Sequence, residues 1–133
     1  MPLYPNDQGN PAGAIPVYLT GGAVIVPTPP TPFPTTIAAG VTYSTGIMLT
    51  SGCKGLAASA ELTQTGVLSI QRYIDPAGTI PIGAAVTQAM TASTLATVAV
   101  NDGLPAAAWQ ASIQNTAGAS GTLSNAALLQ TGT

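Results

Sequence analysis

The chain has 133 residues, a length typical of one domain, and 46% of them are hydrophobic, which is enough to form a core. Only two basic and four acidic side chains are present, whereas an ordinary domain of this size carries about 33 charged residues. The net charge of −2 and the lack of any Lys/Arg cluster exclude binding to nucleic acid by phosphate neutralisation and binding to anionic membranes.

The scarcity of charge predicts a surface that packs against other proteins. A protein that stays dispersed in water normally has a mixed, charged surface. Here the surface would consist mostly of Ser, Thr, Gln, Asn, Gly and Ala. We therefore expect a structural component of a large assembly rather than a free enzyme.

The N-terminal quarter is rich in proline. Nine of the twelve prolines lie in residues 1–34, and the run from Pro27 to Pro34 must be extended because proline fixes φ. Polyproline II is the natural conformation of such a run. The PxxP pattern in it lacks the flanking basic residues of an SH3 ligand. We expect an extended arm over 1–34 and a domain over 35–133.

Two short apolar segments, 15–19 and 23–26, flank the turn signal Thr20-Gly21-Gly22. They are either two strands of the domain or an arm that adds strands to a neighbouring subunit. The side chains expected at an interface formed by the arm are Leu3, Tyr4, Ile15, Val17, Tyr18, Val24, Ile25 and Phe33.

After residue 35, short strands alternate with turns. Alternating apolar positions predict an antiparallel β-sandwich of seven or eight strands, either a jelly roll or an immunoglobulin-like fold. Because Thr and Val occupy alternate positions, 84–99 is predicted as strand rather than helix. The expected strands are 41–49, 56–62, 67–74, 86–91, 94–100, 109–115 and 122–129. The side chains expected to face the core are Leu56, Ala58, Ala60, Leu62, Leu68, Ile70, Ala96, Val98, Val100, Trp109, Ala111 and Ile113.

The residue types needed for catalysis are scarce. There is no histidine, and Cys53 is the single cysteine, which we expect to be a buried thiol. Glu61 is expected on the polar face of a strand, while Asp75 and Asp102 lie in the turn sequences Asp75-Pro76-Ala77-Gly78 and Asn101-Asp102-Gly103. We therefore expect no catalytic residue, no metal site, no cofactor and no enzymatic activity.

Three larger side chains are candidates for a surface or interface. Arg72 is expected to point outward beside Tyr73 and to pair with Glu61 on the neighbouring strand. The alternation of Trp109 with apolar residues favours a core or interface position. An exposed Trp109 or Tyr73 would instead provide a platform for a sugar ring.

Residues 56–130 resemble a known family. The order is Thr63 to Gln71, then the turn that begins at Asp75, then Ala111 to Gly118 and a final Thr/Leu strand. This order is similar to that of the small β-sandwich modules of tailed-bacteriophage virion proteins, which include capsid decoration proteins and head fibres. The proline-rich segment resembles the extended arms of capsid-associated proteins.

The resemblance implies a structural role on a virion. The expected partners are further copies of the chain, for example in a trimer, and the major capsid protein or other virion proteins, with no nucleic acid and no membrane. No apolar run reaches the ~18 residues of a spanning helix, and the first residues lack signal-peptide features, so we expect assembly in the host cytoplasm. A head fibre, neck or tail position stays open, as does a sandwich module that binds a glycan or a host.

Overall fold

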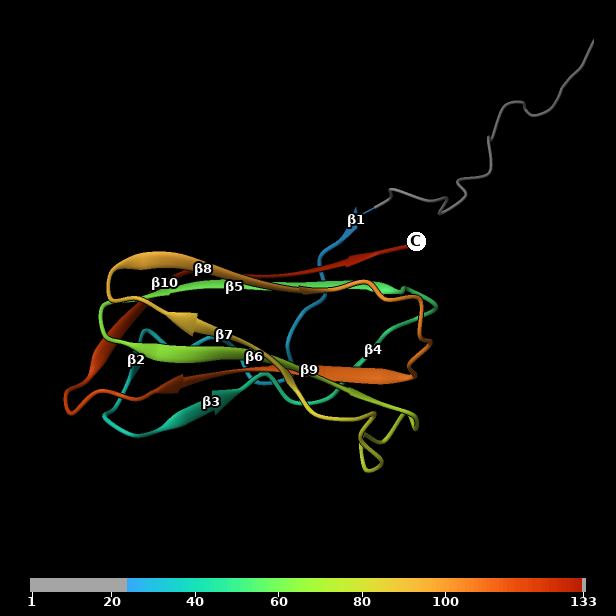
Figure 1. Ribbon diagram of the computed structural model, residues 1–133, viewed down its shortest axis with the longest axis horizontal. Helices are drawn as coiled ribbons and strands as arrows, with labels where there is room; N and C mark the ends of the chain where they lie inside the picture. The colour runs from blue at the N-terminus through green and yellow to red at the C-terminus, as the bar shows by residue number, and fades with distance from the viewer. Residues whose placement is uncertain (1–23, 133) are drawn as a thin grey trace, which may run out of the picture.

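The computed structural model describes residues 24–132, and all regular secondary structure in this range is β-strand. Ten strands form two sheets of five strands each within the described residues. Every strand pairing in these sheets is antiparallel. The two sheets lie face to face as two layers (Figure 1), so the predicted antiparallel β-sandwich is confirmed.

The first sheet has the order β1-β10-β5-β8, and β2 also pairs with β10. Its strands are β1 (Val24–Ile25), β2 (Thr36–Ile37), β5 (Gly55–Leu62), β8 (Thr94–Val100) and β10 (Gly121–Thr131). The second sheet has the order β3-β9-β6-β7, and β4 also pairs with β9. Its strands are β3 (Thr42–Ser44), β4 (Met48–Leu49), β6 (Gly66–Tyr73), β7 (Val86–Met90) and β9 (Ala108–Asn115).

The strand pairs are nested within one another along the chain. β1 and β2 pair with β10, β3 and β4 pair with β9, β5 pairs with β8, and β6 pairs with β7. These pairs form when the chain folds back on itself between β6 and β7, so that its two halves make one long antiparallel ribbon. Rolling that ribbon up places β10 beside β5 and β9 beside β6, as observed. The connectivity is therefore that of a jelly roll, one of the two sandwich topologies that the sequence left open.

Strict alternation along the strands builds the core between the sheets. In β5, β6, β8 and β9 every second side chain is buried, and the hydrophobic ones among them belong to one cluster. Every side chain predicted to face the core is buried, as is the Cys53 thiol. Because the side-chain period of a strand is two, alternation in the sequence was enough to assign the faces.

The segment expected as one strand over 41–49 forms two short strands instead. Ser44 and Met48 are four positions apart, while their partners on β9, Ser112 and Trp109, are three positions apart. One extra residue therefore bulges out between β3 and β4. Gly46 lies in this bulge with φ of +84°, a conformation that residues with a side chain rarely adopt.

The described part of the proline-rich segment lies against the sandwich of its own chain. The Thr31 amide donates to the Thr45 carbonyl at 2.9 Å, and the Tyr43 hydroxyl donates back to the Thr31 carbonyl at 2.5 Å. The Phe33 ring packs on the Tyr43 ring, with their centroids 5.5 Å apart. Polyproline segments make no internal hydrogen bonds, so their backbone groups are available to a neighbouring surface. Residues 24–34 are thus fastened to the domain, although the sequence placed the start of the domain at residue 35.

The loops gather at the two ends of the sandwich. At the right-hand end of Figure 1 lie three connections, 50–54, 74–85 and 101–107, together with the start of β1. The opposite end carries the shorter connections 38–41, 63–65, 91–93 and 116–120. The first of these ends holds the candidate functional site.

Candidate functional site

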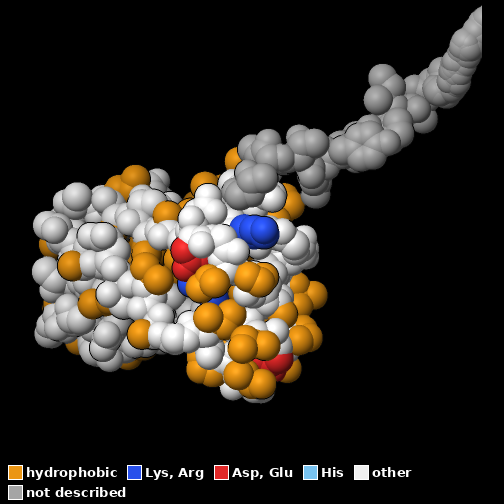
Figure 2. All heavy atoms as spheres, turned by 45° about the vertical axis from the view of Figure 1, so that its right-hand side comes forward, with side chains coloured by type: hydrophobic (Ala, Val, Ile, Leu, Met, Phe, Trp, Pro, Cys, Tyr) orange, Lys and Arg blue, Asp and Glu red, His pale blue; other side chains and the backbone are white. Residues whose placement is uncertain are grey.

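Exposed aliphatic side chains converge at the long-loop end of the sandwich. Ile74 is 63% exposed, Ile80 is 53% exposed, and Leu104 is 52% exposed. Together with Ile82 and Pro105 these residues form a surface that we call the apolar tip. A shallow hollow of about 580 Å³ lies in it, lined by Ile74, Ile82, Leu104, Pro105, Ala106 and Ala107. Figure 2, which brings this end forward, shows hydrophobic side chains crowded together with few charged ones among them.

Asp75 shapes the first of the two loops that form the tip. Its carboxylate accepts the backbone N–H groups of Thr79 and Ile80 at 2.9 and 2.8 Å, and the Thr79 hydroxyl at 2.5 Å. These hydrogen bonds, the Thr79 hydroxyl first, hold the pKa of Asp75 below its usual value. The turn predicted at Asp75 is confirmed, since the Gly78 amide donates to the Asp75 carbonyl. The carboxylate therefore fixes the path of the chain between Ile74 and Ile80.

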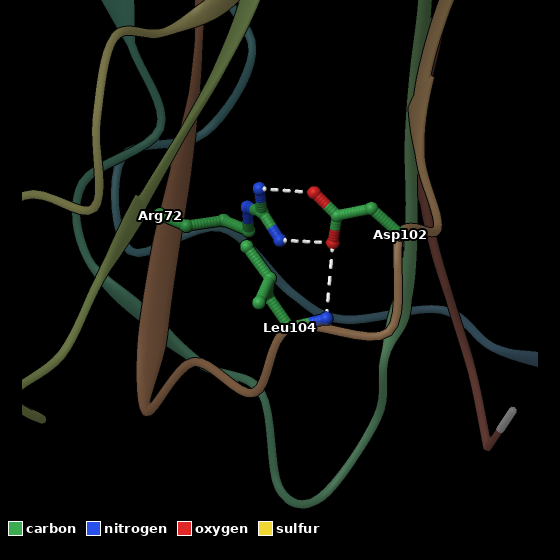
Figure 3. A network of polar contacts seen from close by, with 3 residues as sticks. All are labelled: Arg72, Asp102 and Leu104. Carbon is green, nitrogen blue, oxygen red and sulfur yellow. Dashed lines mark hydrogen bonds and ion pairs between the residues drawn. The ribbon is translucent and has the colours of Figure 1, made fainter.

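Asp102 shapes the second loop through an ion pair (Figure 3). Two nitrogens of the Arg72 guanidinium each lie 2.8 Å from an oxygen of the Asp102 carboxylate. The same carboxylate accepts the Leu104 amide at 3.1 Å. Arg72 is on β6 in one sheet, and Asp102 follows β8 in the other, so the pair connects the two layers directly behind the tip.

The expectation that Arg72 points outward was wrong. Arg72 is opposite Trp109 in the register of β6 and β9, on the inner face of the sheet, and its side chain is only 9% exposed. It occupies the last inward position of β6, where a long side chain can carry its charge to the open end of the sandwich. Glu61, the expected partner, instead accepts a hydrogen bond from the Asn125 side chain at 3.0 Å.

The Arg72–Asp102 pair makes stability depend on pH. The Arg72 hydrogen bonds lower the pKa of Asp102 to about 2, so the folded state binds the proton more weakly than the unfolded state. The stabilisation is present above the pKa of an unfolded Asp, about 3.9, and is lost as pH falls towards about 2. We expect the Asp102→Asn variant to melt below the parent protein at pH 6, with the difference in Tm shrinking steadily as pH falls from about 4 to 2.

Thermal denaturation of both proteins between pH 2 and pH 7 measures this difference. The other carboxylates titrate in both proteins and cancel in the comparison. A difference in Tm that stays constant across the whole range would contradict the linkage.

Tyr73 and Trp109 are also not at the surface. Trp109 is fully buried in the core, and Tyr73 is 8% exposed beneath the loop in which Pro81 bridges to it. The Tyr73 hydroxyl accepts a hydrogen bond from the Gln110 side chain at 2.6 Å. Neither ring offers a free face, so the sugar platform considered from the sequence is absent at these two positions.

Only some of the predicted arm residues are in the described part of the chain. Val24 is exposed, Ile25 is half-buried, and Phe33 packs against the core. The other five, Leu3, Tyr4, Ile15, Val17 and Tyr18, lie outside the described residues. The sequence did not single out the apolar tip. Its signal was present, however, as aliphatic residues on both sides of the turn acid Asp75 and shortly after the turn acid Asp102.

Within residues 24–132, no group of three or more His, Cys, Asp or Glu side chains is placed to hold a metal ion. No helix in this range is long and apolar enough to cross a membrane. A search of protein-family models and of curated proteins found no match to this chain.

Proposed function

We propose that the protein is a structural subunit of a virion, of the capsid-decoration type, which assembles through its low-charge surfaces. The observation that carries this proposal is the apolar tip. A small domain with so few charges and several large aliphatic side chains exposed at one end has a surface suited to protein contact. Jelly rolls occur in viral capsid domains and also in lectins and cupins, so the fold is compatible with this role without establishing it.

The use of the charged residues supports the proposal. Asp75 and Asp102 are engaged in hydrogen bonds that shape the loops beneath the aliphatic side chains. These carboxylates thus help to present a contact surface. Because Arg72 and Asp102 pair with each other and the Asp75 carboxylate accepts hydrogen bonds from its own loop, these charges already have partners when another protein covers the tip. Burial then stabilises the contact by roughly 25 cal/mol per Å² of apolar area.

The expected partners are copies of the chain, as in a trimer, and the capsid protein of the particle. Such contacts should depend little on salt, because there are few ion pairs for salt to screen. A particle that released the protein between low and moderate salt would count against this role.

The double variant Ile74→Ser/Leu104→Ser tests the apolar tip. Burying an Ile or Leu contributes about 1.5–3 kcal/mol, so we expect association to weaken at least ~100-fold. Native mass measurement of the full chain over a range of concentrations gives the assembly state. Val41→Ser is the matched control, because Val41 is 48% exposed and lies at the opposite end of the sandwich. If the parent chain stays a single copy at high concentration, the proposed function is wrong.

A further inference from the structure

The outer face of the first sheet is hollowed. Two grooves of about 190 and 160 Å³ adjoin there, and both are lined by Ala57 and Leu129. The surface is hollow here because small alanine side chains face outward at neighbouring positions of adjacent strands: Ala57 on β5 is opposite Ala99 on β8. The larger side chains of Leu129 on β10 and Leu95 on β8 also line these grooves. The paired grooves form a shallow trough across three strands.

The trough contains no charged side chain and is lined largely by aliphatic groups. Leu95 is 55% exposed and Leu129 is 39% exposed, so their apolar surface is not covered by the described part of the chain. The wall of the first groove includes Val24, the first described residue. The undescribed segment 1–23 therefore joins the domain at the mouth of the trough.

We propose that residues 15–19 of a second copy of this chain dock in the trough. This inference rests on the proposed function, because it requires copies of the chain to meet. In an extended conformation Ile15, Val17 and Leu19 point to one side, at the spacing with which a strand presents apolar side chains to a surface. Residues 8–23 contain no charged side chain, which matches the uncharged lining of the trough.

The segment reaches a neighbour when two copies adjoin near Val24. Residues 20–23 separate residues 15–19 from Val24, and fully extended these four residues span about 13 Å. Residues 24–34 are fastened to their own domain by β1 and by the contacts of Thr31 and Phe33, so the anchor point is fixed. To occupy its own trough, the segment would have to reverse direction at Thr20-Gly21-Gly22, the turn signal in the sequence, whereas the segment of a second copy needs no reversal there.

Disulfide trapping tests this docking in the full chain. Two single variants, Val17→Cys and Ala99→Cys, are prepared in a Cys53→Ser background, refolded together and oxidised with oxidised glutathione. We expect a disulfide between residues 17 and 99 of different chains, identified by peptide mass spectrometry. Pairing Val17→Cys with Ala92→Cys is the control, because Ala92 is exposed in the β7–β8 turn at the far end of the sandwich. Docking raises the local concentration at residue 99, so this link should form about 100-fold faster than the control link.

The double variant Val17→Cys/Ala99→Cys distinguishes the source of the segment. A link confined to one chain would overturn docking from a second copy, and so would equal linking at residues 92 and 99. Native mass of the same proteins before oxidation separates the two proposals. An oligomer without the link between residues 17 and 99 overturns the docking and leaves the proposed function standing, whereas a monomer overturns both.

Discussion

Replacing Trp109 with alanine is expected to lower the free energy of unfolding by about 3–5 kcal/mol. Trp109 is fully buried between the sheets and is the largest buried side chain of the described core. Its cross-strand partners are Met48 on β4 and Arg72 on β6, the strands on either side of β9. Backbone hydrogen bonds hold these strands in place, so the cavity left by the indole would collapse only in part. Urea denaturation of the parent and variant proteins measures the loss.

Trp109→Phe is the informative companion variant. Among the described residues the indole Nε1 has no hydrogen-bond partner, so replacing the indole with phenyl breaks no hydrogen bond. We expect a smaller loss than for alanine. Leu49→Ala, at a 58% exposed position on β4, controls for the removal of an aliphatic side chain outside the core. A loss below ~1 kcal/mol for Trp109→Ala would contradict the core position of the ring.

Replacing Asn115 with aspartate is expected to destabilise the fold by at least ~3 kcal/mol at pH 7. Asn115 is fully buried at the end of β9. Its side-chain amide donates to the carbonyls of Ile37 and Ala119 at 2.9 and 2.8 Å, and its oxygen accepts the Ala117 amide at 2.9 Å. A carboxylate would place negative charge against two carbonyl oxygens and could donate to neither. The side chain thus joins β2 to the β9–β10 connection only as an amide.

The effect of Asn115→Asp should depend on pH. A protonated carboxyl can donate one hydrogen bond, so the loss of stability should be smaller at pH 3 than at pH 7. Gln114→Glu is the matched control, because it makes the same change of amide to carboxylate at the adjacent, exposed position. Its expected effect is within about 0.5 kcal/mol. Equal losses for the two variants would show that the contacts of the Asn115 amide contribute nothing.

The sheets could be predicted largely from the sequence because alternation carries the information. Residues such as Leu56, Ala58 and Ile113 were assigned to the core from their period alone, and all of them are buried. The turns at Asp75 and Asp102 were also predictable, because Asp and Gly at fixed offsets bond locally and tolerate unusual φ values. What the sequence left open was which strands pair, because nested pairing joins residues far apart in the chain.

The candidate site was less predictable for a related reason. The alternation along β6 places Arg72 on the same, inward face as Leu68 and Ile70, which is its observed position. Arg72 was nevertheless predicted to point outward, because a charged residue is ordinarily assigned to the solvent-facing side. Only the three-dimensional structure shows that this position opens towards Asp102 across the sandwich. Ile74 and Leu104 lie in loops that have no periodicity, so their convergence depends on loop geometry.

The position of β10 has a consequence for how the protein is made. β10 lies between β1 and β2 on one side and β5 on the other, and Val24 pairs with Thr131 from the far end of the described chain. During translation, the first sheet therefore cannot close until residues 121–131 have emerged from the ribosome. Contacts between such distant residues are slow to form, and an unpaired β5 would expose its edge in the meantime. Nascent polypeptides should consequently need protection by chaperones until β10 has been synthesised.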